Sequence, residues 1–426
     1  MDPPRDISCR LLVIGAGMAG MAASLFAARR GIDTVQVGLS STIPFASGLL
    51  DLLGVYPADA GRVLADPWTG LARLRRETDA HPYARLSNRH MRAAWDQCLQ
   101  FLADAGQPYV RHPQRNRQVV TAVGTVKTTY AVPHTMAAAD EVLSRRPPCL
   151  LVDFAFLKGF SARQIAATLG PDWPGLHARR LPVHGMQGEI QPERLGRYLE
   201  NRDRCRRLAA DIRSHVKGVR AVGLPAVVGI HRHRANFAVM QQIIGRPLFE
   251  IPTMLPSVPG LRLRETFESQ LPRIGVRAWY QHRVTAVEYQ GRQGFHLRIG
   301  SATDEFRVQA RAVILATGRF FGRGLHAERT AIREPLFDLP VHQPSRRERW
   351  HQKDLLHRAG HAINRAGLAV DDCFRPVDFE GRRVMPRLFA AGSILAHQDW
   401  VREKCGSGLA LASAYAAVRA VERLTG

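Results

Sequence analysis

Residues 9–20 read CRLLVIGAGMAG and combine an apolar run with three closely spaced glycines. The apolar run has the composition of a buried parallel strand. Good helix formers over 18–30 predict a helix, which Gly31 is placed to end, and a second strand follows at 34–37. The order strand, glycine turn, helix, strand predicts a βαβ unit of the dinucleotide-binding type.

Each glycine of this G-x-G-x-x-G pattern has its own role. Gly15 permits the tight turn, Gly17 lets a phosphate approach the backbone, and Gly20 lets helix and strand pack closely. The helix that follows offers free N–H groups and a partial positive charge to a phosphate. We therefore expect these three glycines to bind a nucleotide cofactor.

The second strand lacks the acidic residue that usually binds an adenosine ribose. Its end reads VQVGLS at 35–40, and Asp33 lies at the opposite end of the strand. Two interpretations stay open: either the cofactor is the mononucleotide FMN, or Ser40 or Ser41 replaces the carboxylate and FAD is bound.

Three more glycine motifs follow later in the chain. ATG occupies 316–318 after the apolar run AVIL, LFAAGS occupies 388–393, and CGSG at 405–408 precedes a long helical segment. Their order resembles that of flavoproteins with two dinucleotide-binding domains. In that family the late A-x-G-D strand ends beside the ribityl phosphate, and the last helix directs its positive end at the flavin ring. Here Ser393 stands in place of the acidic residue.

Four further runs resemble the family formed by the B subunit of anaerobic glycerol-3-phosphate dehydrogenase. The likeness covers nearly the whole chain and is weakest at 106–150 and 340–375. It implies an α/β protein with an FAD/NAD(P)-binding Rossmann-like flavoprotein fold and an inserted cap domain. The runs are FASGLLDLL at 45–53, LPSV at 255–258, GLRL at 260–263 and GLHAERTAIREP at 324–335.

We expect two domains that interleave along the chain. The Rossmann-like flavin-binding domain is expected to take 1–55, 275–335 and 376–426. The inserted cap or partner domain is expected to take 56–274 and 336–375. Alternating polar and apolar residues at 283–308 predict an antiparallel meander inside the flavin domain.

The resemblance also implies a function. The B subunit of this family belongs to a membrane-associated enzyme that oxidises sn-glycerol 3-phosphate to dihydroxyacetone phosphate and passes the electrons to a quinone. It is described with FMN, which agrees with the missing carboxylate, and FAD is the alternative. It works with a separate catalytic subunit that carries FAD, and with an iron–sulfur subunit that anchors the complex at the cytoplasmic side of the inner membrane. No base for a hydroxyl proton is evident in this sequence, which favours an electron relay.

Candidate site residues follow from the motifs and the resemblance. Arg329 and Arg333 are the catalytic candidates, because residues four apart share one face of a helix and two guanidinium groups can clamp a phosphate. Ion pairs with Glu328 or Glu334 are the alternative. We expect no metal site. The expected cofactor-binding residues are Gly15, Gly17, Gly20, Ser47, Gly48, Thr317, Gly318, Gly392, Ser393, Gly406 and Gly408.

Several other polar residues have weaker claims. Cys405 precedes the last helix, where a thiol pKa would fall, but a small residue packed against the flavin is the favoured interpretation. Lys404 could face the flavin or solvent. His397 and Asp399 could act in proton transfer or lie on a surface loop. The run HRH at 231–233 is expected to be a solvated loop rather than a metal site.

Length and composition exclude several classes of protein. With 426 residues, 45% of them apolar, the chain can bury the cores of two or three domains. Six scattered cysteines without a C-x-x-C pair indicate buried thiols in a reducing compartment. No apolar run reaches the ~20 residues of a membrane span, and the first residues do not resemble a signal peptide, so we expect a soluble cytoplasmic protein.

The net charge of +23 comes from 60 Lys and Arg against 37 Asp and Glu. A chain this basic could bind nucleic acid, an acidic partner or an anionic membrane. Only five of the basic residues are lysine, a skew that genome composition can produce. The flavin motifs account for a function without nucleic acid, so no nucleic-acid partner is expected. Two alternatives remain, a nucleic-acid-acting flavoprotein and a degenerate flavin fold that serves as an assembly scaffold.

Overall fold

The computed structural model describes residues 4–39, 42–301 and 303–425. The chain divides into two compact units, which are discontinuous in sequence. Unit 1 consists of 1–42, 51–101 and 267–426, and unit 2 consists of 43–50 and 102–266.

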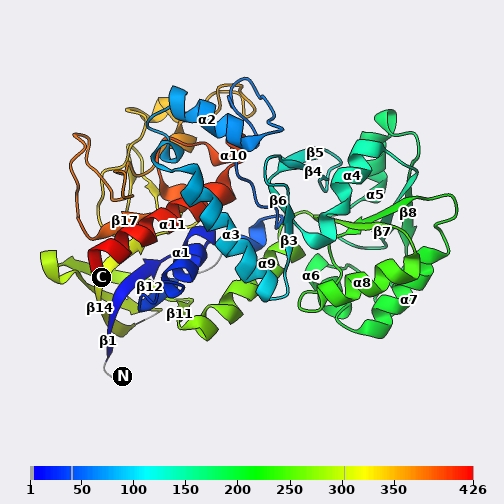
Figure 1. The fold of residues 1–426 in the computed structure, drawn as a ribbon, viewed down its shortest axis with the longest axis horizontal. Coiled ribbons are helices and arrows are strands. Elements are labelled where there is room, and N and C mark those ends of the chain that lie inside the picture. The colour runs from blue at the N-terminus through cyan, green and yellow to red at the C-terminus, as the bar shows by residue number, and fades with distance from the viewer. Residues whose placement is uncertain (1–3, 40–41, 302, 426) are drawn as a thin grey trace. The chain divides into compact units, whose positions relative to one another are not determined.

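A seven-stranded mixed sheet forms the centre of unit 1 (Figure 1). Six strands follow the order β11-β2-β1-β14-β13-β12, and β17 pairs with β14. The apolar run predicted as a strand lies in β1, where Leu11, Leu12 and Val13 are fully buried. The strands are β1 (Arg5–Ile14), β2 (Thr34–Gly38), β11 (Arg277–Tyr280), β12 (Arg283–Tyr289), β13 (Phe295–Gly300), β14 (Asp304–Leu315) and β17 (Leu388–Ala390).

Strand β14 joins two segments that the sequence presents separately. Its first part completes the predicted antiparallel meander with β12 and β13, which is confirmed. Its second part is the AVIL run and lies parallel to β1 and β17. Leu315 pairs with Ile14 on one side and with Ala390 on the other, so three strands end at the same edge of the sheet.

Helices α1 (Met18–Ala28) and α11 (Gly406–Thr425) pack side by side in unit 1 (Figure 1). The rings of Phe26 and Tyr415 meet edge to face at 5.3 Å between centroids. Helix α1 is buried continuously over 19–27, because it is apolar on all sides. The other helices and the small hairpin of this unit are α2 (Pro67–Glu77), α10 (Trp400–Glu403), β15 (His326–Ala327) and β16 (Ile332–Arg333), while α3 (Asn88–Asp104) and α9 (Val258–Gln270) continue from one unit into the other.

Unit 2 is built on a four-stranded parallel sheet of order β10-β9-β7-β8. The strand predicted at 149–154 is β7, which is buried along its whole length. The predicted cap of the next helix is confirmed, since Ser161 Oγ accepts from the N–H of Gln164 at 3.2 Å. The elements are β3 (Tyr109–Arg111), β4 (Arg117–Val120), β5 (Val126–Thr129), β6 (Ala131–Pro133), β7 (Cys149–Phe154), β8 (Leu176–Leu181), β9 (Ala221–Pro225), β10 (Leu248–Ile251), α4 (Ala138–Arg145), α5 (Ala162–Leu169), α6 (Pro192–Tyr198), α7 (Arg202–Arg213) and α8 (His233–Ile244).

The two units divide the chain differently from the expected domains. Residues 56–101 and 336–375, with the short stretch 267–274, were expected in the inserted domain but belong to unit 1, whereas 43–50 were expected in the flavin domain but belong to unit 2. Tyr83 explains the first difference, because its hydroxyl donates to the carbonyl oxygens of Leu52 at 2.7 Å and Cys405 at 3.2 Å. The segment 336–375 is joined to the C-terminal part of unit 1 by an isolated β-bridge between Leu368 and Leu395.

Within the part of the chain that the structure describes, no helix combines the length and apolar character needed to cross a bilayer.

Candidate functional site

The turn between β1 and α1 can be made only by glycine at two positions. Gly15 has φ +138°, and a Cβ there would lie 2.2 Å from the carbonyl oxygen of Ala316. A Cβ at Gly20 would lie 2.0 Å from the carbonyl oxygen of Gly15. Both approaches involve backbone, which cannot give way cheaply, so the predicted close packing of turn, helix and strand is confirmed.

The first turn of α1 is left open for an anion. Gly17 is the N-cap, no side chain of the described residues forms a capping hydrogen bond, and the first turn holds no acidic residue. Among the described residues, a Cβ at Gly17 would meet only Thr42 Oγ1, at 3.5 Å, so no described backbone crowds this N-cap. The N–H groups and the helix dipole at this end can therefore bind a phosphate.

The later motifs come together at the same edge of the sheet. Gly392 has φ +83°, and a Cβ there would lie 2.6 Å from Ala19 Cβ in α1, so this position also requires glycine. A Cβ at Gly318 would lie 3.5 Å from Ser393 Oγ. Predicted cofactor residues from three distant parts of the sequence thus lie together in unit 1, and their binding of a cofactor stays a prediction.

The hydroxyl of Thr317 supports a ligand at this site. Its Oγ1 is buried, and no hydrogen-bond partner for it exists among the residues that the structure describes. A buried hydroxyl without a partner costs free energy, which a bound polar group would recover. The glycine turn, the open helix end and this hydroxyl fit the phosphate and polar edges of a flavin nucleotide, whose chemistry is hydride and electron transfer.

The end of β2 excludes a ribose-binding carboxylate at one position. A Cβ at Gly38 would lie 2.6 Å from Ala16 Cβ and 2.7 Å from Ala16 N, so no side chain fits there. Asp33 precedes β2, as predicted, and its carboxylate pairs with Arg277 at 2.7 Å. The alternative with Ser40 or Ser41 lies outside the described residues.

Sequence reasoning missed two residues that hold this site. Gln36, fully buried in β2, donates from Nε2 to the carbonyl oxygen of Gly15 at 3.0 Å and so fixes the glycine turn. Arg319 follows Gly318 and donates to the carbonyl oxygens of Ser393 (2.7 Å), Gln398 (3.0 Å), Leu395 (3.3 Å) and Asn364. Burial lowers the pKa of Arg319 to about 10, so the guanidinium stays charged at neutral pH. Only its place directly after A-T-G could have signalled it.

A buried hydrogen-bonded cluster precedes α11. Glu403 Oε2 lies 3.3 Å from His81 Nε2 and 3.3 Å from Cys405 Sγ. The N–H of Tyr83 donates to His81 Nδ1 at 3.0 Å, so a neutral His81 carries its proton on Nε2, facing Glu403. A protonated Nε2 cannot bind a metal ion, and the arrangement therefore suits a hydrogen-bond relay.

The ionisation of this cluster follows from its burial. Burial opposes ionisation of Glu403, but the hydrogen bonds from His81 and Cys405 lower its pKa below the usual value. Burial, then the nearby carboxylate, raise the pKa of the Cys405 thiol well above its usual value. The expectation of a lowered thiol pKa at this helix end is therefore wrong, while the interpretation of Cys405 as a small packed residue agrees with its full burial.

The start of helix α11 is hydrogen-bonded to the beginning of segment 51–101 of unit 1. The N–H of Gly408 donates to the carbonyl oxygen of Asp51 at 2.6 Å, and a Cβ at Gly408 would lie 2.5 Å from the hydroxyl oxygen of Tyr83. Gly406 is the first residue of the helix. Both glycines belong to unit 1 with the glycine turn.

Ser47 and Gly48 lie in unit 2, unlike the other expected cofactor residues. Gly48 has φ +77°, and a Cβ there would lie 2.5 Å from Pro259 Cβ. The hydroxyl of Tyr109 donates to the carbonyl oxygen of Gly48 at 2.8 Å. The loop is thus held firmly within unit 2, and its role in cofactor binding stays a prediction.

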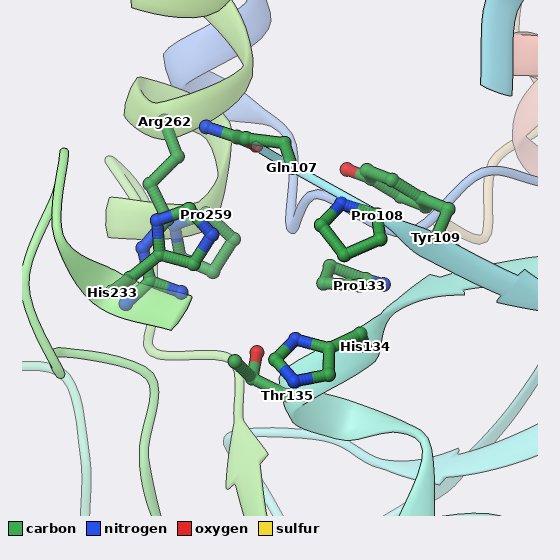
Figure 2. A pocket seen from close by; sticks show the side chains of 9 residues that line it. All are labelled: Gln107, Pro108, Tyr109, Pro133, His134, Thr135, His233, Pro259 and Arg262. Carbon is green, nitrogen blue, oxygen red and sulfur yellow. The ribbon is translucent and has the colours of Figure 1, made fainter. Parts of the chain in front are cut away.

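A small pocket lies beside this loop in unit 2. Figure 2 shows side chains of α8, of α9 and of the short helix η3 (His134–Met136) around it. Its volume of about 10 Å³ suits one water molecule rather than a substrate. Burial lowers the pKa of His134, and lowers that of His233 to about 3, so both imidazoles are neutral. The pocket is therefore a structural feature of this unit.

The segment with Arg329 and Arg333 is a hairpin and not a helix. β15 pairs with β16, and both arginines are exposed. Arg333 pairs with Glu328 at 3.1 Å, which is the alternative considered from the sequence. Gln343 fixes the turn, because its side-chain amide exchanges two hydrogen bonds with the backbone of Ile332, at 2.6 and 2.9 Å. The prediction that the two arginines share one face of a helix is therefore wrong. A catalytic role for them stays a prediction.

A larger cavity of about 400 Å³ lies next to this hairpin in unit 1. Its ten lining residues include Arg365, His342 and His361 and no carboxylate. The backbone of Arg365 is tied to the loop after Ser393, since its carbonyl oxygen accepts from the N–H of His397 at 3.0 Å. The cavity can therefore hold a small anionic molecule close to the edge where the glycine motifs meet.

The weaker candidates have varied surroundings. Burial, and then His342, lower the pKa of His397 to about 4, and the two imidazoles lie 4.1 Å apart between ring centroids. Asp399 is buried and caps α10. Lys404 is half-buried with φ +51° and ends α10. The run at 231–233 is not a uniform solvated loop, because His233 is buried at the start of α8.

Comparisons with known proteins agree with this geometry. The sequence profile of the family described as FAD binding domain matches residues 10–409. The chain is similar to a protein of Halobacterium salinarum named as the probable B subunit of anaerobic glycerol-3-phosphate dehydrogenase, with 32% identity over 96% of this chain and 97% of the relative. It is also similar to the B subunit of anaerobic glycerol-3-phosphate dehydrogenase of Vibrio cholerae, with 26% identity over 96% of this chain and 95% of the relative.

Solved structures resemble the chain only distantly. A flavocytochrome c3 fumarate reductase in its open conformation aligns with 98% of this chain and 79% of its own length, at 10% identity and a TM-score of 0.43. The family match carries the assignment and confirms the predicted flavoprotein fold. The chain therefore belongs to the FAD binding domain family and, with these relatives, to the family formed by the B subunit of anaerobic glycerol-3-phosphate dehydrogenase.

Proposed function

We propose that this chain is the flavin-containing subunit of a membrane-associated anaerobic glycerol-3-phosphate dehydrogenase. In this role the complex oxidises sn-glycerol 3-phosphate to dihydroxyacetone phosphate and passes the electrons to a quinone. The observation that carries the proposal is the meeting of Gly15, Gly318 and Gly392 beside an open helix end, in a chain whose relatives bear the name of this enzyme.

The cofactor that we propose is FMN, with FAD as the alternative. The support is the end of β2, where the contact between Gly38 and Ala16 leaves no room at position 38 for a carboxylate that would bind an adenosine ribose. An FMN molecule needs one phosphate site, which the first turn of α1 supplies.

The cavity lined by Arg365 and His342 is the place we propose for a phosphorylated substrate. It has no carboxylate that would repel a phosphate, and Arg365 is the one residue of its lining that is charged at every physiological pH. Arg329 and Arg333 lie on the hairpin that Gln343, another lining residue, holds in place, and we propose that they assist substrate binding from there.

The partners that we propose are a catalytic subunit with FAD and an iron–sulfur subunit that anchors the complex. The relatives are named as one subunit of this enzyme, so they work with at least one other polypeptide. In this proposal the chain sits on the cytoplasmic side of the inner membrane, held there through its complex.

The test is the flavin content and substrate response of the complex purified from cells that coexpress all three subunits. We expect heat to release FMN from this chain, identified by mass spectrometry, and sn-glycerol 3-phosphate to bleach the flavin absorbance of the complex. The variant Arg365→Gln should raise the KM for the substrate at least tenfold, whereas Arg311→Gln, at an exposed position outside the cavity, should leave it unchanged. A colourless protein would support the scaffold alternative and refute the proposal.

A further inference from the structure

The most exposed apolar side chains of unit 1 lie in one short segment. Every residue of 351–359 is exposed, and we name this segment the basic loop. At its centre, the side chains of Leu355 and Leu356 are 84% and 91% exposed. Single exposed leucines are common on proteins, but two adjacent ones at the tip of a loop indicate a surface that meets an apolar partner.

Hydrogen bonds at both ends of the basic loop hold its tip outward. His361 accepts from the N–H of Gln352 through Nδ1 at 3.0 Å, and its Nε2 lies 3.0 Å from the carbonyl oxygen of Leu355. The guanidinium of Arg402 donates to the carbonyl oxygen of Arg358 and, at 2.8 Å, to that of Ala58. The leucines are therefore displayed by a braced loop, and their exposure is part of the fold.

Cationic side chains flank these leucines along the chain, and Asp354 is the one acidic residue of the basic loop. Arg346, Arg349, Lys353 and Arg358 are exposed, and none of them forms an ion pair within the described ranges of the chain. Through Arg402 the loop adjoins α10, which exposes Trp400 at 41% and Val401 at 48%. Exposed apolar residues in a segment with more cations than anions, adjoining a helix with an exposed indole, have a composition that favours binding to the interface of an anionic membrane.

We propose that the basic loop docks this chain directly onto an anionic phospholipid bilayer. Leu355 and Leu356 enter the interface, while Lys353 and Arg358 bind lipid phosphates. Nucleic acid would satisfy the cations but offers no apolar environment for the leucines. In the proposed function the membrane is reached through a different polypeptide of the complex, so direct contact goes beyond that function and does not depend on it.

Vesicle binding by the purified flavin-loaded protein tests the leucines. Wild type should sediment with vesicles of phosphatidylglycerol and phosphatidylcholine, and only weakly with pure phosphatidylcholine. The variant Leu355→Ser/Leu356→Ser should bind the anionic vesicles roughly tenfold more weakly, because the apolar contribution is lost. Phe379→Ser is the matched control, since Phe379 is 76% exposed in the same unit but outside the basic loop.

The charged residues need a control that equalises net charge, because a protein of +23 attracts any anionic surface. Each basic residue near a bilayer contributes about 1 kcal/mol, or about fivefold in affinity. Lys353→Gln/Arg358→Gln should therefore weaken binding by about 30-fold. Lys217→Gln/Arg220→Gln removes the same charge from exposed positions in unit 2 and should have a much smaller effect. Flavin absorbance and thermal unfolding of each variant check that it is folded.

Two outcomes would overturn the proposal. In the first, the leucine variant binds anionic vesicles as tightly as Phe379→Ser does. In the second, the basic-loop variants keep vesicle binding but fail to associate with native membranes that contain the rest of the complex. That second result would assign the loop to a protein partner instead of lipid.

Discussion

Replacing Glu250 by Gln should lower the stability of unit 2 by about 3 to 5 kcal/mol. Glu250 and Arg262 form a buried ion pair, with oxygen–nitrogen distances of 2.6 and 2.9 Å and exposures of 1% and 2%. The carboxylate also accepts from the hydroxyl of Thr135 at 2.7 Å and from the N–H of Val228 at 3.0 Å. The amide of Gln has nearly the same shape as the carboxylate, but its N–H groups would face the N–H and O–H groups that donate to Glu250. The substitution also leaves Arg262 as an uncompensated buried charge.

Thermal unfolding of the purified protein, followed by circular dichroism, measures the loss. For a unit of this size 1 kcal/mol corresponds to about 2 to 4 °C, so the transition of unit 2 should fall by roughly 10 °C. Glu77→Gln is the control, because it breaks the exposed pair with Arg73 on α2 and should change the transition little. A transition for Glu250→Gln within about 2 °C of wild type would refute the reasoning about burial.

The pH dependence gives the same prediction a second readout. Burial opposes ionisation of Glu250, but the charge of Arg262 and the hydrogen bonds lower its pKa. A lowered carboxyl pKa stabilises the fold above the unfolded value of about 4.3, and this contribution disappears as the pH falls through the folded value. The difference between wild type and Glu250→Gln should therefore shrink in acid.

Three further predictions concern the glycine turn, the thiols and a buried imidazole. Gly20→Ala should yield protein without flavin absorbance, since the new methyl would lie 2.0 Å from a carbonyl oxygen, whereas Gly170→Ala, with no atom within 4 Å, should keep its colour. Native protein should react with one equivalent of Ellman's reagent, at Cys373, because the other five cysteines are buried; a second rapidly reacting thiol would contradict this burial. Because burial lowers the folded pKa of His233 to about 3, the unfolded chain binds more protons below about pH 6.5, and stability should rise with pH between 3 and 6.5. Urea unfolding at several pH values should show that the free energy of unfolding of His233→Gln rises less steeply with pH than that of wild type. An unchanged dependence on pH would assign the titration to another group.

The glycine motifs could be predicted because their cause is local. Gly20 is dictated by a steric contact with the carbonyl oxygen of Gly15, and Gly15 by its φ of +138° in the turn, so both requirements arise within one strand–turn–helix unit that the sequence displays directly. The buried strand β7 and the cap at Ser161 follow from short-range patterns in the same way. These patterns were enough to predict a flavoprotein fold, which the family match confirms.

The parts that could not be predicted depend on residues far apart in sequence. Glu403 is brought to His81 across 322 positions, and Arg319 reaches carbonyl groups 45 to 79 positions away. The spacing of Arg329 and Arg333 suggested a helix, but two hydrogen bonds from Gln343 to Ile332 stabilise a hairpin instead. Tertiary contacts of this kind override local spacing, and a single sequence does not display them.

The pairing of β1 with β14 has a consequence for the biosynthesis of this protein. About 300 residues separate the two strands, so at a typical ribosomal rate β1 and the apolar α1 wait roughly 15 to 60 s for their neighbour. Unit 2, which is almost continuous in sequence, can fold during that interval. Gly392 and α11, which pack against α1, emerge last. We therefore expect flavin insertion to follow translation, and a chain truncated before β17 should accumulate with a folded unit 2 and no flavin.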